Sequence, residues 1–217
     1  MKLAALGIRV HSGWGALVAV TGDARALELV DRRRIVTMDP RMAGAKQPFH
    51  HAEKLPLRAA AEHLRKCEAL SQRLTSAAVR DVANELRARG FAVPRSAILL
   101  SSGRPLPSLQ KTLASHALIH TAEGEFFRRI FWQACAQLDI QVIGIRERDL
   151  DARASAIFGR TAAPLRKRIA ALGKLLGPPW TADQKNAALA ACMALAGGKN
   201  VIDSGASVSP APSLDVN

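Results

Sequence analysis

Two histidines and an acidic residue recur at helical spacing in the stretch SHALIHTAEGE, residues 115–125. In an α-helix, residues three or four positions apart lie on one face, so His116, His120 and Glu123 form a single stripe. Two imidazoles and a carboxylate in this arrangement are suitable ligands for a transition metal ion. They also suit acid–base catalysis, with His120 as a general base that Glu123 orients. The competing interpretation is structural: buried histidines that hydrogen-bond the backbone or a neighbouring carboxylate.

The other members of this candidate site come from distant parts of the chain. His11 ends the first apolar stretch, and Asp183 lies in the last one. If the first and fourth strands are neighbours in the sheet, His11 lies near Ser101, Ser102 and the helix that begins close to His116. We therefore expect one catalytic cluster formed by His11, Asp183 and the 116/120/123 stripe, with a divalent metal as its cofactor if it is a metal site.

Two further polar or aromatic features have simple structural interpretations. His50 and His51, followed by Glu53, fall in a stretch without periodicity (residues 39–54), which we interpret as a polar loop. Trp14 stands between two glycines and is expected to cover an edge of the core, although stacking on a nucleic-acid base is the functional alternative.

Composition limits the class of protein. The 217 residues are 48% hydrophobic and 23% charged, which is typical of a globular domain. No apolar run approaches the roughly 20 residues of a membrane span, and the apolar stretch at the N-terminus is too short for a signal peptide. We expect a cytoplasmic protein without membrane contact. The three cysteines (Cys67, Cys135 and Cys192) have apolar neighbours and are expected to be buried free thiols.

Positive charge is the strongest compositional signal. Lysine and arginine number 31 against 18 acidic residues, a formal charge of +13. Such an excess favours DNA or RNA as a partner. The segment 160–174 has five basic residues and no acid, and we predict phosphate contacts there from Arg160, Arg166, Lys167, Arg168 and Lys174. The alternative is an ordinary solvated helix face. Arg32–Arg34 are expected to protect a sheet edge from pairing, and Arg128–Arg129 to lie on the outer side of their helix.

Hydrophobic periodicity predicts the order β-β-β-α-β-α-β-α-α. Three strands lie within residues 3–38, and Gly22-Asp23 is a candidate hairpin turn between the second and third. Apolar spacing of three and four predicts a helix over 56–89, and a second long helix covers 109–139. Buried strands are predicted at 96–102 and 141–147. Helices follow near 149–158 and 164–176, and the last helix, at 181–196, begins with a Thr181–Gln184 capping box.

This order predicts an α/β fold. Two antiparallel hairpins followed by right-handed crossovers give a mixed five-stranded sheet, strand order 3-2-1-4-5, with helices on both faces. The domain spans 1–196, and residues 197–217, which lack aromatics and periodicity, are expected to form a flexible tail.

The chain resembles the ribonuclease H-like superfamily, and within it the RuvC-type Holliday-junction resolvases. The opening LGIRVHSGWGALV is similar to the family's first strand and Gly-aromatic-Gly turn. SAILLSS falls where the family has its fourth strand, and GKLLGPPWTADQKNAALAACMALA is similar to its C-terminal helix. The resemblance implies a nuclease that holds two divalent metals with carboxylates on the first strand, the fourth strand and the last helix.

The sequence departs from that carboxylate pattern. Arg9 replaces the acid of the first strand, and the fourth strand ends Leu100-Ser101-Ser102 without one. Asp183 matches the last helix, with Asn186 three residues later. We therefore expect a nucleic-acid-associated protein that is a degenerate nuclease or one with altered chemistry, alone or as a homodimer. One alternative is a non-catalytic protein-interaction module. Another is a phosphoryl-group enzyme, but the lack of a glycine-rich phosphate loop beyond residues 13–15 disfavours that enzyme class.

Overall fold

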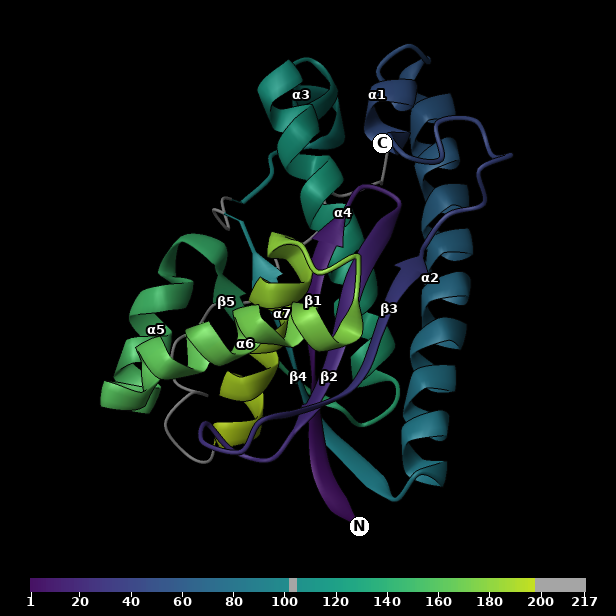
Figure 1. Cartoon of the computed structure of the whole chain (residues 1–217). Coiled ribbons are helices and arrows are strands. Elements are labelled where there is room, and N and C mark those ends of the chain that lie inside the picture. Colours follow the sequence, from purple (N-terminus) through teal and green to yellow (C-terminus); the bar gives the residue numbers. More distant parts are fainter. Residues whose placement is uncertain (102–104, 198–217) are drawn as a thin grey trace.

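Five strands form one mixed sheet in the computed structural model, which describes residues 1–101 and 105–197 (Figure 1). The order is β3-β2-β1-β4-β5, as the sequence predicted. β1 pairs antiparallel with β2 and β2 with β3, whereas β4 is parallel to both β1 and β5. The strands are β1 Lys2–His11, β2 Trp14–Thr21, β3 Glu28–Val36, β4 Phe91–Leu100 and β5 Gln141–Arg146.

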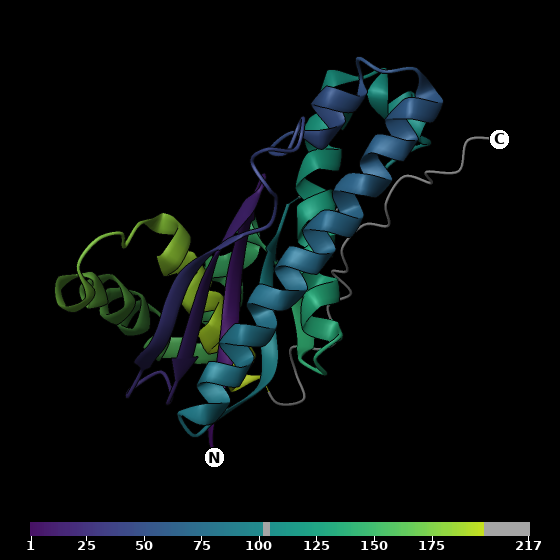
Figure 2. The ribbon, with the colours of Figure 1, turned by 90° about the vertical axis from the view of Figure 1, so that its right-hand side faces the viewer.

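Helices cover both faces of this sheet, also as predicted (Figure 2). One face carries α1 Pro48–Ala52, α2 Leu57–Ala88, α3 Leu109–Leu113 and α4 His116–Ala136. The other carries α5 Leu150–Phe158, α6 Ala162–Leu176 and α7 Ala182–Ala196. The sheet therefore separates two cores. The larger is built around Phe127 and Phe131 of α4 with Leu64 of α2, and the smaller around α7.

The contact between β1 and α7 is unusually close. A Cβ at Gly7 would lie 1.8 Å from the carbonyl oxygen of Ala187, so only glycine allows α7 to approach β1 this far. Residues 187–194 of α7 are all apolar and all buried, between the sheet and the helices α5 and α6. Its predicted capping box is confirmed: the Thr181 N–H donates to Gln184 Oε1 (2.9 Å), and Thr181 Oγ1 accepts from the Asp183 N–H.

The structure corrects the sequence prediction in several places. The segment 39–54 contains the short helix α1, which Pro48 initiates at its first turn. The predicted helix 109–139 is two helices, because Ser115 has an extended backbone (φ −135°, ψ 113°) and α4 starts after it. The β2–β3 connection spans residues 22–27, so it is longer than a two-residue hairpin.

Other predictions hold or fall outside the description. β3 lies at the sheet edge, where its three arginines were expected. All three cysteines are free and buried. Across the described ranges, no helix has the length and apolar character needed to cross a bilayer. Of the tail expected at 197–217, the structure describes Gly197 alone. Ser102 also lies outside the described residues.

Candidate functional site

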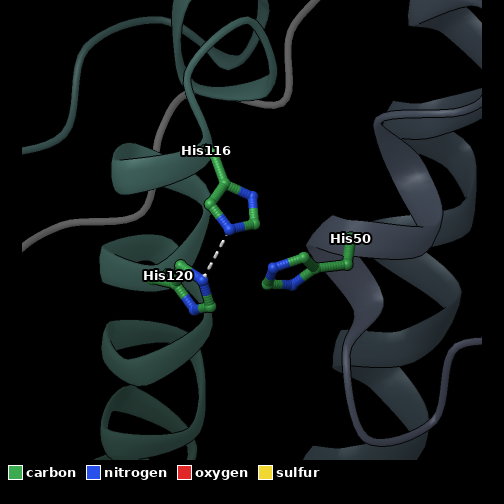
Figure 3. Close-up of side chains that lie close together, drawn as sticks. All are labelled: His50, His116 and His120. Atoms are coloured by element: carbon green, nitrogen blue, oxygen red, sulfur yellow. Dashed lines mark hydrogen bonds between the residues drawn. The ribbon is translucent and has the colours of Figure 1, made fainter.

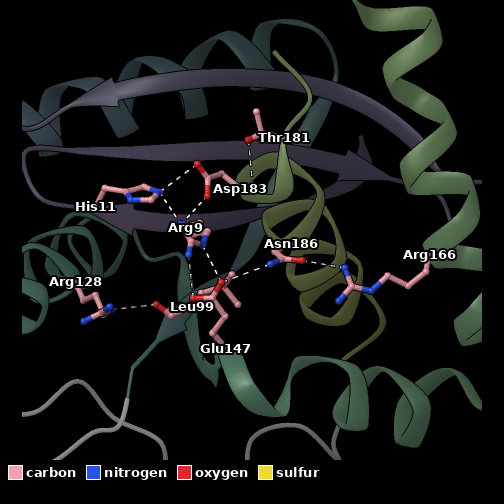
Figure 4. A network of polar contacts seen from close by, with 9 residues as sticks. All are labelled: Arg9, His11, Leu99, Arg128, Glu147, Arg166, Thr181, Asp183 and Asn186. Atoms are coloured by element: carbon pink, nitrogen blue, oxygen red, sulfur yellow. Dashed lines mark hydrogen bonds and ion pairs between the residues drawn. The ribbon is translucent and has the colours of Figure 1, made fainter. Parts of the chain in front are cut away.

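Side chains that could do chemistry gather where the parallel strands end (Figure 4). Because side chains alternate along a strand, Arg9 and His11 of β1 point to the same face as Gly7, toward α7. Asp183 lies in the first turn of α7 and Glu147 directly follows β5. β1, the start of α7 and the residue after β5 thus bring four side chains to the edge where the parallel strands end.

Arg9 is the centre of this cluster. Its Nε donates to Glu147 Oε1 at 2.9 Å, and its Nη1 donates to Asp183 Oδ1 at 2.5 Å. The pair with Asp183 is partly buried, with the Arg9 side chain 25% and the Asp183 side chain 23% exposed, whereas the Glu147 side chain is 41% exposed. Burial lowers the pKa of Arg9, but Glu147 and Asp183 outweigh it, so the net pKa is raised. The guanidinium therefore remains charged and neutralises both acids.

His11 belongs to the same cluster. Its Nε2 lies 2.7 Å from Arg9 Nη1 and 3.2 Å from Asp183 Oδ2. The imidazole stacks on Trp14, with ring centroids 4.3 Å apart and planes 9° from parallel. Arg34 of β3 packs over the same indole at 3.7 Å. Trp14 thus orders His11 and an edge arginine, and it is half-buried beside the site.

The cluster continues into a chain of arginine–acid pairs. Asn186 donates to Glu147 Oε1 at 3.5 Å and accepts from Arg166 Nη1 at 2.9 Å. Arg166 also pairs with Asp151 at 2.6 Å. At the end of β4, Arg128 donates to Ser101 Oγ and to the Leu99 carbonyl. Every acid of this cluster is paired with an arginine: Glu125 with Arg128, Asp151 with Arg166, and both Glu147 and Asp183 with Arg9.

Two arginines expected on an outer helix side are instead largely buried. The Arg128 side chain is 16% exposed and the Arg129 side chain 14%, and Arg129 pairs with Glu68 of α2 at 2.9 Å. Burial lowers the pKa of Arg128, against the raising effect of Glu125. These arginines hold α4 to the sheet edge and to α2, so they are structural.

Three histidines form a separate cluster between α1 and α4, which lie on the other face of the sheet. Figure 3 shows their three imidazoles. Ligand atoms of His50, His116 and His120 all lie within 4.8 Å of one another. His116 Nε2 and His120 Nε2 are 3.0 Å apart. No interaction within the described ranges joins His11 to this group, so the expected convergence of His11 with His116 and His120 is not found. His11 lies on the face of the sheet that α7 covers, whereas α4 carries His116 and His120 on the opposite face.

Glu123 stands behind this histidine group. Its Oε1 accepts from His50 Nδ1 at 3.1 Å and from the backbone N–H groups of Phe49 (2.9 Å) and His50 (3.1 Å). Burial raises the pKa of Glu123, and the hydrogen bonds from His50 and Phe49 oppose that shift. Glu123 is therefore a partner of His50, whereas the sequence placed it beside His116 and His120 as a third ligand.

The five predicted phosphate contacts divide into two kinds. Arg166 is bound within the strand-end cluster, and Arg168 donates to the carbonyls of Ala24 and Arg25. Arg160, Lys167 and Lys174 are exposed. These three cations of α6 and the turn before it are available to a partner.

Sequence reasoning overlooked three features. Glu147 follows a predicted strand and could have been placed at the strand ends from topology alone. His50 was assigned to a loop because a five-residue helix leaves little periodicity. The third feature is a set of exposed arginines along one side of α2, spaced 15, 7 and 7 residues apart, which we call the α2 arginine row. Its members are Arg58, Arg73, Arg80 and Arg87.

Comparison with known proteins gives structural neighbours alone. No protein-family model matches the chain, and no curated protein matches it. The fold is similar to Thermus thermophilus RuvC in complex with a Holliday junction substrate, at 12% identity and TM-score 0.48 over 88% of this chain and 90% of that one. A second T. thermophilus RuvC structure matches at 11% identity and TM-score 0.45, over 87% and 90%. The Aquifex aeolicus member of the Ppx/GppA family matches at 11% identity and TM-score 0.32, over 74% and 40%.

At these levels of overlap the neighbours carry no information on activity. The assignment of the ribonuclease H-like fold rests on the sheet itself: five strands in the order β3-β2-β1-β4-β5, with the β1–β4–β5 strands parallel and helices on both faces.

Proposed function

We propose that this protein binds nucleic acid through the α2 arginine row and does not hydrolyse it at the strand ends. The distribution of charge carries this proposal. The acids at the strand ends are bound to the protein's own arginines, while other cations remain exposed on the outer face of α2.

The α2 arginine row lies along one side of the helix. On a helix with 100° per residue, its four members fall within an arc of about 60°. Glu62 lies within the same arc and pairs with Lys66, whereas Glu68 pairs with Arg129 and Glu85 with Arg33. The fourth acid of α2, Asp81, lies about 100° around the helix from Arg80. Arg65 is on the same face as the row and has a contact of its own.

The length of this row suits a polymer. Arg58 and Arg87 are 29 residues apart, which corresponds to about 43 Å of helix or about 13 base pairs of duplex. Arginine binds phosphate oxygens in bidentate fashion, so guanidinium groups spread along one side of a helix match a chain of phosphates better than a compact anion. In Figure 2, α2 runs along the outside of the molecule with one side open to solvent.

The same charge distribution argues against two-metal hydrolysis. That chemistry needs carboxylates free to coordinate divalent cations. Here Arg9 supplies a fixed positive charge between Glu147 and Asp183, and Arg128 neutralises Glu125. A metal would have to displace a guanidinium from two ion pairs at once. A protein that kept its nucleic-acid surface and lost cleavage is the function that these contacts support best.

Binding to labelled duplex and single-stranded DNA and RNA, measured by fluorescence anisotropy, tests the proposal. Four phosphate contacts predict that log K falls with log salt with a slope of about −3.6, or about 100-fold between 50 and 200 mM salt. Arg73→Glu/Arg80→Glu should roughly halve that slope and weaken binding at least 10-fold. The rival surface is tested by Lys167→Glu/Lys174→Glu, which makes the same change in net charge at two exposed cations of α6 that the sequence also assigned to phosphate contact.

The outcomes separate the possibilities. Loss of affinity in the α2 variant and near-normal binding in the α6 variant support the α2 surface. Equal losses in both variants would contradict it, because net charge alone would then explain binding. No binding to any of the polymers at low salt would remove nucleic acid as the partner and leave the protein-interaction module as the function.

A further inference from the structure

We propose that His50, His116 and His120 bind one divalent transition metal ion of the zinc class. The site lies at the meeting of α1 and α4, on the face of the sheet opposite α7, so it is separate from the Arg9 cluster. None of its ligands belongs to the α2 arginine row.

The spacing of the imidazole nitrogens fits a metal. Two ligands at 2.0–2.1 Å in tetrahedral geometry stand about 3.3 Å apart. His116 Nε2 and His120 Nε2 are 3.0 Å apart, and a nitrogen of His50 completes a triangle with no side above 4.8 Å. Figure 3 shows the three rings turned toward one common point from two different helices. The 3.0 Å pair is within a few tenths of an ångström of this spacing, and rotation of the exposed His116 and His120 side chains can shorten the longer sides, by up to about 1.5 Å, around an ion.

The fold positions the three ligands. His116 and His120 are one turn apart in α4, so they face the same side. His50 comes from α1 and is fixed by Glu123, whose Oε1 accepts from His50 Nδ1 at 3.1 Å. When Nδ1 carries the proton, Nε2 has the free lone pair and is available to coordinate. A carboxylate behind a metal-binding histidine is the usual arrangement for orienting the ring and raising its basicity.

The surroundings of Glu123 give a second, independent reason. Its side chain is 4% exposed, and its Oε2 is buried without a hydrogen-bond partner in the described structure. Among the described residues, neither lysine nor arginine contacts the Glu123 carboxylate, and His50 is the side chain that donates a hydrogen bond to it. A buried carboxylate is costly unless it is paired with a positive group. A metal ion on His50 would supply that charge.

The ligand set defines the kind of ion. Three neutral imidazoles suit Zn²⁺, Co²⁺, Ni²⁺ or Cu²⁺, whereas Mg²⁺ and Ca²⁺ prefer oxygen ligands. His116 and His120 are exposed, so the fourth coordination position opens to solvent. Three protein ligands and one solvent position describe the open type of zinc site rather than the closed structural type.

Metal binding by the full chain, purified without a histidine tag, tests the proposal. Equilibrium dialysis against Zn²⁺ should give one ion per chain, and Co²⁺ should give the visible absorption of a tetrahedral site. His116→Ala/His120→Ala should lower the affinity at least 100-fold. Both side chains are exposed, so circular dichroism should show an intact fold. The matched control is His51→Ala/His63→Ala, which removes two neighbouring imidazoles whose ring centroids are 4.5 Å apart.

Glu123→Gln separates the supporting role from a ligand role. It should weaken binding 10- to 100-fold while the Co²⁺ spectrum stays tetrahedral, because no ligand is lost. Wild-type protein that binds no more Zn²⁺ than the His116→Ala/His120→Ala variant would overturn the proposal, and so would an equal loss in the His51→Ala/His63→Ala control. Nucleic-acid binding does not enter any of these readouts, so the two proposals fail independently.

Discussion

Arg9 determines what the cluster at the strand ends can bind. A guanidinium at this position turns two acids that could hold a metal into the partners of a fixed internal cation. The sequence showed that Arg9 stands where the resemblance places an acid, and that Asp183 remains. It did not show that Glu147 would complete the pairing, because Glu147 meets Arg9 across a sequence separation of 138 residues.

Removing this arginine should change what the site binds. Arg9→Asp removes the internal cation and leaves Glu147 and Asp183 free to coordinate a hard divalent ion. In a His116→Ala/His120→Ala background, which excludes the histidine cluster, we expect Mn²⁺ affinity at the strand ends to rise at least 10-fold. Electron paramagnetic resonance of bound Mn²⁺ measures it, with Arg166→Asp as a control that removes a neighbouring arginine. Unchanged Mn²⁺ affinity in Arg9→Asp would contradict the role assigned to Arg9.

The histidines illustrate the limit of sequence reasoning at the same scale. The i,i+4 spacing of His116 and His120 correctly placed them on one helix face. Their third partner is His50, and nothing in its local pattern connects it with a residue 66 positions later in the chain. Short helices such as α1 are formed by tertiary packing, so their contacts cannot be predicted from periodicity.

At the scale of elements, the sheet and its helices were largely predictable. Long periodic stretches gave α2, and β-branched or apolar runs gave β4 and β5, because such signals persist over many residues. The break between α3 and α4 was missed because it depends on the backbone conformation of one residue, Ser115, inside an otherwise helical pattern.

The contact of β1 with α7 is the element-level feature most sensitive to substitution. Gly7→Ala would place Cβ against backbone atoms of Ala187 that cannot move aside, so we expect a loss of at least about 3 kcal/mol of the free energy of unfolding. Urea denaturation measures it. Gly90→Ala is the control: its Cβ meets nothing within 4 Å and costs only the strain of a positive φ, about 1 kcal/mol. Similar losses in both variants would contradict the close approach.

The start of α7 is a second test at this scale. Thr181→Ala removes the acceptor for the Asp183 N–H and breaks the capping box, which should cost about 1 kcal/mol. Because Asp183 is positioned by the same turn, the variant should also loosen its pairing with Arg9. Thr181→Ser, which keeps the hydroxyl, should retain nearly all of the stability in the same denaturation measurement, and a loss equal to that of Thr181→Ala would argue against the cap.

At the scale of the whole molecule, two cores on opposite faces of one sheet enclose the thiols. Burial raises the pKa of Cys67 and Cys135 to about 11, and that of Cys192 to about 12. At pH 8 these thiols are therefore almost entirely protonated. We expect labelling by a thiol reagent to be at least 100-fold slower in the native protein than in denaturant, where a cysteine has its ordinary pKa near 8.5.

The same shifts predict a loss of stability in alkali. A thiol with a raised pKa in the folded state contributes stability below its unfolded pKa, and that contribution disappears as the pH rises toward the folded pKa. The window therefore runs from about pH 9 to about pH 11–12. Cys135→Ala should flatten the decline of the denaturation midpoint in this range. An unchanged decline would show that other groups cause it, and rapid native labelling at pH 8 would show that the cores are open.

The net charge of +13 is likewise a property of the whole molecule, and it pointed to a polyanion from composition alone. Which cations remain available could not be predicted, because the pairing of Arg166 and Arg168 depends on the folding of α6 against α5 and the β2–β3 connection. The α2 arginine row was present in the sequence at spacings of 15, 7 and 7 residues, and the acids between its members obscured it.

One measurement tests the central claim most directly. End-labelled duplex DNA is incubated with the protein and Mg²⁺ or Mn²⁺ at low salt, then recovered after the salt is raised to about 200 mM. We predict a complex at low salt, its dissociation at the higher salt and full recovery of uncut strands. Strand cleavage that disappears with Asp183→Asn, or the absence of a complex at low salt, would contradict the claim.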